Sequence, residues 1–185
     1  MVLYLLRHEI RSKEKIDFNT NLTFSGKHNS RTRLFNKLEN LQIDEIYSSP
    51  YKRTLDTIGY FSTTKNIPIK IDWALCEHLS KNERNNMKDL PFPNKQEQEK
   101  IHSTYLLDKE YTPTTDLEYI DTYNEDETKF EHRIDNFILF LHTILTKNIL
   151  VVTHKKVCDK ITERLVGNKK DIEMGQCLKL DFCNI

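Results

Sequence analysis

Two histidines follow apolar segments near opposite ends of the sequence. Arg7 and His8 come directly after the run at residues 2–6, and His154 comes directly after the run at residues 149–153. A neutral imidazole is a nucleophile near neutral pH, and a guanidinium binds phosphate oxygens through two parallel hydrogen bonds. Together these residue types suit an anionic substrate and a nitrogen nucleophile, although the Arg-His pair alone would more simply be a surface pair at a strand end.

Both apolar segments have the length and composition of buried strands in an α/β sheet. The carboxyl ends of such strands face the crevice in which open α/β sheets bind ligands. We therefore expect the fold to bring Arg7, His8 and His154 together at one edge of one sheet.

Strand and helix patterns alternate along the rest of the chain. Three short strand patterns cover residues 44–49, 67–72 and 176–182. Four helical patterns, with apolar residues at helical spacing, cover residues 34–41, 55–61, 125–146 and 157–165. This alternation predicts an α/β fold in three layers, α/β/α, with a mostly parallel central sheet.

The length of 185 residues is typical of one domain. Residues 1–185 are therefore expected to form one domain. Polar residues and two prolines interrupt any periodicity near residues 77–118, which favours a helical or loop insertion there.

Local signals predict where several of these elements begin and end. Thr23 or Ser25 is expected to cap the first helix, and Pro50 to lie in the first turn of the second. Pro68 favours a strand at a sheet edge, because proline cannot donate to a ladder of backbone hydrogen bonds. Gly167 is a typical C-cap for the last helix.

The charge composition limits the classes of partner. Lys and Arg total 28, as do Asp and Glu, so the net charge is zero and no overall field attracts nucleic acid or an anionic membrane. No apolar run reaches the roughly 20 residues of a transmembrane helix, and Arg7 interrupts the first run too early for a signal peptide. The four cysteines form no C-x-x-C pair, so we expect reduced thiols and a cytoplasmic protein.

Five short motifs occur in a fixed order along the chain. They are Leu-Leu-Arg-His at 5–8, Leu-Thr-x-x-Gly at 22–26, Tyr-Ser-Ser-Pro-x-x-Arg-Thr-x-x-Thr at 47–57, Leu-x-Glu at 75–77 and Val-Val-Thr-His at 151–154. Together they resemble the histidine phosphatase superfamily, whose fold is phosphoglycerate mutase-like. The resemblance spans nearly the whole chain.

The resemblance implies a phosphatase that forms a phosphohistidine on His8. Arg7 and Arg53 match the two family arginines that bind the phosphoryl oxygens, and His154 matches a second histidine that neutralises charge on the transferring group. It also implies a metal-independent hydrolase of the histidine acid phosphatase type that needs no cofactor. The expected substrate is a small phosphorylated molecule.

The leaving alkoxide needs a proton donor, and the family offers two positions for it. Some members carry an acid directly after the second histidine, where this chain has Lys155. Others use the glutamate of the Leu-x-Glu motif, which Glu77 matches. Glu77 is therefore the candidate acid and base if burial or neighbouring charge raises its pKa toward neutrality; the alternative is an ordinary solvated carboxylate.

The chain departs from the family pattern near the first histidine. Glu9 stands where glycine or alanine is usual, and its carboxylate either repels the substrate or points away from it. A polar phosphate ligand expected several residues later falls near Glu14 and has no match. Arg133 resembles a family Glu-x-x-x-Arg helix element with a structural role, and His78 is expected at the surface.

Two other functions remain as alternatives. One is a phosphotransferase of the phosphoglycerate mutase type, although such mutases are generally longer, so this compact chain favours hydrolysis. The other is a catalytically weak phosphate-binding or partner-binding module of the same fold. A binding module would have no need of an acid such as Glu77.

Overall fold

The computed structural model describes residues 2–14, 17–78, 95–115, 125–144 and 147–181. Its centre is a five-stranded sheet in the order β3-β2-β4-β1-β5. The strands are β1 (Val2–Arg7), β2 (Glu45–Ser48), β3 (Ile69–Ile71), β4 (Ile149–Thr153) and β5 (Cys177–Asp181). Only β5 is antiparallel to its neighbour, so the expected mostly parallel sheet is confirmed.

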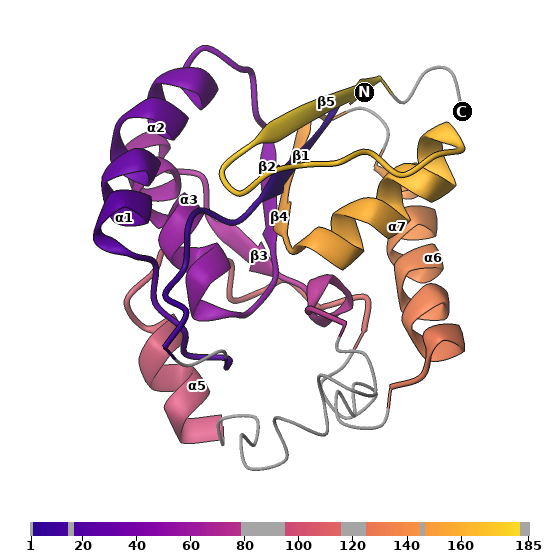
Figure 1. The fold of residues 1–185 in the computed structure, drawn as a ribbon, viewed down its shortest axis with the longest axis horizontal. Helices are drawn as coiled ribbons and strands as arrows, with labels where there is room; N and C mark the ends of the chain where they lie inside the picture. The colour runs from indigo at the N-terminus through magenta and orange to yellow at the C-terminus, as the bar shows by residue number, and fades with distance from the viewer. Residues whose placement is uncertain (1, 15–16, 79–94, 116–124, 145–146, 182–185) are drawn as a thin grey trace.

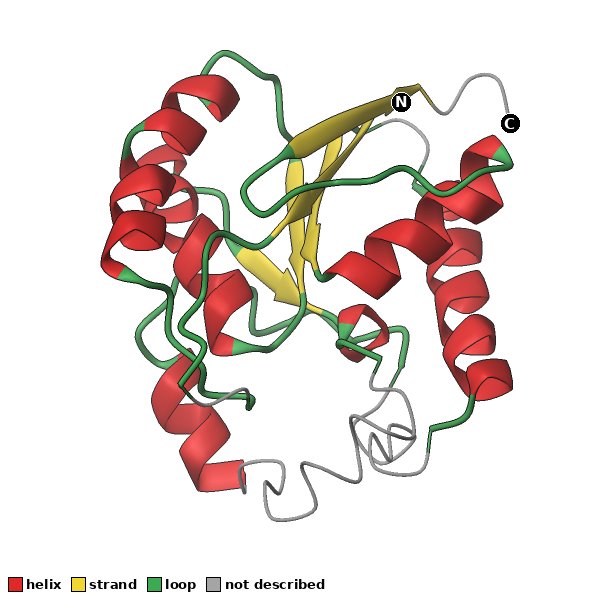
Figure 2. Cartoon of the chain, in the orientation of Figure 1, coloured by secondary structure: helices red, strands yellow, loops and turns green. Residues whose placement is uncertain are grey.

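Helices cover both faces of this sheet, as Figures 1 and 2 show. On one face lie α1 (Phe24–Arg31), α2 (Arg33–Leu38) and α3 (Lys52–Lys65). On the other face lie α6 (Glu127–Thr143) and α7 (Lys155–Val166). The described chain also contains α5 (Lys95–His102) and the short 3-10 helix η1 (Trp73–Leu75). The three-layer α/β/α prediction is therefore confirmed.

The first strand shows why its sequence is apolar without interruption. Leu3 and Leu5 pack into the core beneath α6 and α7, whereas Tyr4 and Leu6 pack into the core beneath α2 and α3. Successive side chains of a strand point to opposite faces of the sheet, so a strand covered on both faces needs apolar residues at every position.

The pairing of β1 with β4 places the two histidines side by side. The strands are parallel, and Arg7 lies opposite Thr153 in the ladder. Each strand ends at that pair, so His8 and His154 both emerge at the same edge of the sheet. This confirms the expectation that one edge receives both.

Several local signals are confirmed. The side chain of Thr23 accepts a hydrogen bond from the Gly26 N–H and caps α1. Gly167 ends α7 in the left-handed conformation with φ +74, which favours glycine. The strand after Pro68 lies at the edge of the sheet.

Among the described residues, no helix is long and apolar enough to cross a membrane.

Two helix predictions are wrong at their ends. The single helix expected from the cap at Thr23 or Ser25 to Leu41 is two helices, because Thr32 leaves helical geometry (φ −119, ψ −88) and its hydroxyl donates to the His28 carbonyl (2.9 Å); the second of them ends at Leu38. Pro50 lies outside the first turn of α3, because Tyr51 is extended and its N–H donates to the Ser49 hydroxyl.

Two further segments differ from expectation at their boundaries. The helix expected from residue 125 begins two residues later, because the Asp126 carboxylate caps it by accepting from the Lys129 N–H (2.8 Å). Residues 79–94 and 116–118 of the expected insertion lie outside the described residues, as does Phe182 of the last predicted strand.

Replacing Leu5 by alanine tests the two-sided core. Leu5 is fully buried, so we expect Leu5→Ala to lower the free energy of unfolding by about 3 kcal/mol through lost burial and a residual cavity. Leu139 on α6 is 64% exposed, and Leu139→Ala should change stability by no more than about 0.5 kcal/mol. Urea denaturation of both variants provides the measurement, and equal losses would contradict this account.

Candidate active site

His8 is buried at the end of β1 with one ring nitrogen held by the backbone. Its Nδ1 lies 2.8 Å from the carbonyl oxygen of Glu9. A carbonyl can only accept, so Nδ1 carries the proton and Nε2 has a free lone pair. Burial lowers the pKa of His8 to about 3, and the charges of Arg53, Arg7 and Arg11 act in the same direction. The imidazole is therefore neutral near neutral pH.

His154 is fully buried beside it. The two ring centroids are 5.4 Å apart, and Nε2 of His154 lies 2.9 Å from the hydroxyl of Ser49. Burial lowers the pKa of His154 well below its usual value, and the charge of Arg53 acts in the same direction. The site thus contains two neutral imidazoles.

Arg53 and Arg7 reach the same site from different elements. Arg53 lies in the first turn of α3, where its Nη1 donates to the Asp17 carbonyl (2.9 Å) and its guanidinium lies 4.4 Å over the ring of Tyr51. Arg7 at the end of β1 donates through Nη1 to the Ile172 carbonyl (3.1 Å). Burial lowers the pKa of Arg53, but a guanidinium remains charged in proteins.

Glu77 faces the same histidine. Its Oε2 lies 3.8 Å from Nδ1 of His154, and its side chain is 18% exposed. Burial raises the pKa of Glu77, against the opposing charges of Arg53, Lys156 and Arg7. A carboxyl group with a raised pKa holds its proton to a higher pH than an ordinary carboxyl group, which suits a proton donor.

Buried polar atoms without a hydrogen-bond partner are concentrated at this site. Five such side-chain atoms occur among the described residues, and four of them are Nε of Arg7, Nε of Arg53, Oε1 of Glu77 and Nδ1 of His154. Buried polar groups are nearly always paired in folded proteins. Positively charged donors beside a free imidazole lone pair suit the binding and attack of a phosphoryl group.

The loop that carries Glu77 is held by Arg133, which is fully buried. Its guanidinium donates to the carbonyls of Ala74 and Cys76 and pairs with the carboxylate of Glu125 (2.5 Å). This fits the structural role expected of Arg133, although its partner lies eight residues away in the sequence.

His78 is not at the surface, so that expectation is wrong. It is 6% exposed, its Nδ1 lies 3.0 Å from Glu125, and its ring stacks on Phe130 at 4.4 Å. The carboxylate of Glu125 therefore attracts both His78 and Arg133. Burial alone would raise the pKa of Glu125, but hydrogen bonds from these two residues lower it.

Two residues near the site were given no role from the sequence. Ser49 belongs to the Ser-Ser-Pro motif, and its contact with His154 follows from the pairing of β2 with β4. Arg11 is half-buried, and its charge lowers the pKa of both His8 and His154. The sequence signal that could have identified Arg11 is its position three residues after His8.

Glu14 is exposed, and its N–H donates to the Ser12 hydroxyl.

Comparison with protein-family models identifies the family. The model described as "Histidine phosphatase superfamily (branch 1)" matches residues 3–185. The chain belongs to this superfamily. No curated protein matches the chain. Among the described residues, no group of three or more His, Cys, Asp or Glu side chains is arranged to hold a metal ion.

Solved structures of phosphatases and a mutase share the fold. An alpha-ribazole phosphatase from Shigella flexneri is 20% identical, with coverage of 98% of this chain and 90% of that one and a TM-score of 0.70. A mycobacterial glucosyl-3-phosphoglycerate phosphatase is 15% identical (97% and 89%, TM-score 0.65). A phosphoglycerate mutase from Bacillus anthracis str. Sterne is 18% identical (97% and 86%, TM-score 0.62). At these identities, the likeness shows the phosphoglycerate mutase-like fold alone.

Replacing Arg133 tests its part in holding the Glu77 loop. Arg133→Met leaves the Glu125 carboxylate buried without its guanidinium, so we expect the free energy of unfolding to fall by about 4 kcal/mol. Arg164 is the matched control, since it pairs with Asp135 (2.7 Å) at the surface. Arg164→Met should cost no more than about 1 kcal/mol. Similar losses in guanidinium denaturation would contradict the assignment.

Proposed function

We propose that the protein is a phosphatase that hydrolyses a phosphomonoester of a small molecule through a phosphohistidine on His8. The observation that carries this proposal is the Nε2 lone pair of His8, left free by the hydrogen bond from Nδ1 to Glu9. The unpaired Nε donors of Arg7 and Arg53 support it, because their positive charge can stabilise the negative charge of a transferring phosphoryl group.

In the first step, Nε2 of His8 attacks phosphorus, and the bond from phosphorus to the leaving oxygen breaks. Arg7 and Arg53 bind the phosphoryl oxygens and offset their charge. Glu77 in its protonated form gives its proton to the leaving oxygen, and an alcohol departs. The raised pKa of Glu77 supports this role.

In the second step, water attacks the phosphorus of the phosphohistidine. Glu77, now a carboxylate, takes the proton of that water, and the bond between phosphorus and Nε2 of His8 breaks. Inorganic phosphate leaves, and both residues return to their starting protonation states. His154 stays neutral and close to the reacting centre, so an N–H group of its ring can donate to a phosphoryl oxygen. Because the ring carries no charge, it does not attract the nearby Glu77 carboxylate more strongly.

The mutase remains the second candidate within the superfamily, because one neighbour is a phosphoglycerate mutase. Hydrolysis is favoured because two other neighbours are phosphatases and the chain is compact. A module that only binds phosphate is disfavoured by Glu77, since a carboxylate near the site would weaken anion binding unless it served proton transfer.

Removal of His8 tests the nucleophile. We expect His8→Ala to lower kcat for p-nitrophenyl phosphate by about a thousandfold or more, because alanine lacks the nitrogen that attacks phosphorus. His28 is exposed on α1, so His28→Ala should retain full activity. Wild-type activity is expected to survive EDTA. A folded wild type without activity toward any phosphomonoester would favour the binding module.

The leaving group tests Glu77 as the acid. Glu77→Ala should lower kcat about a hundredfold for an alkyl phosphate, but less than about tenfold for p-nitrophenyl phosphate, whose leaving group hardly needs a proton. Exposed Glu99 on α5 provides the control, and Glu99→Ala should affect neither substrate. Equal losses for both substrates would count against Glu77.

The pH dependence tests the same assignment. Glu77 must be protonated for the first step, and its pKa is raised, so kcat/KM for an alkyl phosphate should fall as pH rises through that pKa. Glu77→Gln should abolish this basic limb. His8 has a pKa of about 3, so its protonation should add no acid limb between about pH 5 and pH 8. An acid limb in that range that disappears with a His8 substitution would contradict the assignment.

A further inference from the structure

We propose that Glu9, Arg33 and Gly175, here called the Glu9 cluster, position His8 for attack and keep its proton on Nδ1. The inference rests on the proposed function for its effect on turnover. Glu9 is the residue that departs from the usual glycine or alanine after the Arg-His motif. Its carboxylate is fully buried and paired with the guanidinium of Arg33.

Glu9 is held through both its side chain and its backbone. Its Oε1 accepts from Nη2 of Arg33 (3.2 Å), and its Oε2 accepts from the N–H of Ile10 (3.3 Å). Its own N–H donates to the hydroxyl of Thr57 (2.9 Å). Its carbonyl accepts the Nδ1 proton of His8 (2.8 Å). The orientation of that carbonyl therefore depends on contacts made by the same residue.

Gly175 provides the space for this carboxylate. The N–H of Gly175 donates to the carbonyls of both Arg7 and His8 (3.1 Å each), so the loop lies directly against the catalytic segment. A Cβ atom at Gly175 would lie only 2.1 Å from Oε1 of Glu9. A glycine at 175 and a glutamate at 9 therefore fit together, and a side chain at 175 would displace the carboxylate.

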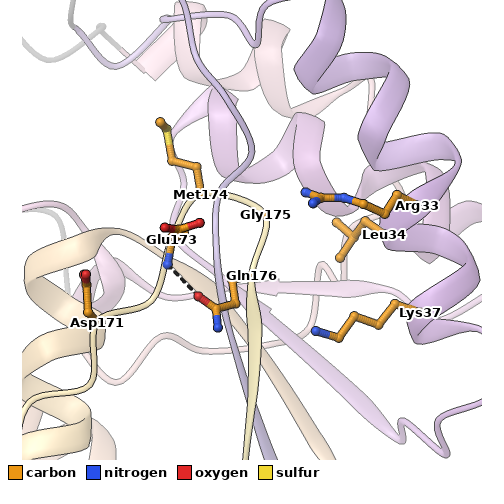
Figure 3. A pocket seen from close by; sticks show the side chains of 8 residues that line it. All are labelled: Arg33, Leu34, Lys37, Asp171, Glu173, Met174, Gly175 and Gln176. Atoms are coloured by element: carbon orange, nitrogen blue, oxygen red, sulfur yellow. Dashed lines mark hydrogen bonds between the residues drawn. The ribbon is translucent and has the colours of Figure 1, made fainter.

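Arg33 is the charged partner that the cluster needs. Figure 3 shows Arg33 extending from α2 toward the loop that carries Gly175, across a cavity of about 530 Å³. The Arg33 side chain is 65% exposed, whereas that of Glu9 is fully buried. Among the described residues, Arg33 is the cation paired with Glu9, so its removal would leave a buried carboxylate uncompensated.

The cluster affects chemistry through the tautomer of His8. If Glu9 turns to bring its carboxylate to solvent, its carbonyl moves and Nδ1 loses its acceptor. The ring proton then distributes between the two nitrogens, and the fraction with a free Nε2 lone pair falls. Thr57 extends the effect, because its hydroxyl accepts from Glu9 and donates to the carbonyl of Arg53 (2.7 Å).

The first test combines kinetics with the tautomer of His8. Arg33→Met should lower kcat for p-nitrophenyl phosphate about tenfold with little change in KM, and Arg33→Lys should recover most of this loss because it keeps the charge. Nitrogen-15 NMR of the histidine rings should show the Nδ1-protonated form of His8 in the wild type. In Arg33→Met it should show a second population with the proton on Nε2.

A pair of glycine variants separates the contact with Glu9 from backbone strain. Gly175 and Gly167 have nearly the same φ, +73 and +74, but nothing lies within 4 Å of a Cβ added at Gly167. Gly167→Ala should change kcat less than about twofold, whereas Gly175→Ala should lower it about tenfold or more. The double variant Glu9→Gly/Gly175→Ala should recover part of that loss, because it removes the clashing carboxylate.

The outcomes distinguish this inference from the proposed function. Unchanged kcat and an unchanged His8 tautomer in folded Arg33→Met would overturn the positioning role, whatever the substrate. Equal effects of Gly175→Ala and Gly167→Ala would overturn it as well. If the wild type is inactive toward phosphomonoesters but Arg33→Met still shifts the His8 tautomer, the result supports the positioning role of the cluster and contradicts the phosphatase.

Discussion

The parallel pairing of β1 with β4 is the constraint on which the site depends. The ladder continues one residue past the strands, where the N–H of His8 donates to the carbonyl of Thr153 (3.0 Å). This register places the ring centroids of His8 and His154 5.4 Å apart. A slip by one residue would turn every β1 side chain to the opposite face and move His8 along the ladder relative to His154, so the site depends on this register.

The other groups are fixed relative to that pair by buried polar contacts. The hydroxyl of Thr153 donates to the Leu75 carbonyl (2.7 Å), which joins the end of β4 to the loop of Glu77. Arg133 holds the same loop from α6. The site therefore combines rigid backbone positions with side chains whose remaining donors and acceptors have no partner among the described residues, as expected for a preorganised anion site.

The sequence predicted the elements whose causes are local. Apolar runs identified the strands, and strand-end histidines identified the edge, because side-chain burial and strand direction follow from a few consecutive residues. The burial of His78 was not predictable, since its partner Glu125 lies 47 residues away. The end of α1 at Thr32 depends on one hydroxyl contact, and the fit of Glu9 against Gly175 depends on loop geometry that periodicity does not encode.

The central claim is that Nε2 of His8 is the atom that receives the phosphoryl group, because Nδ1 is held by Glu9. The most direct measurement is to quench the enzyme during turnover in alkaline denaturant, isolate the phosphopeptide and assign the phosphorylated nitrogen by NMR. We predict a single phosphohistidine, at His8 and on Nε2. A phosphoryl group on Nδ1 of His8, or on a different residue, would contradict the account.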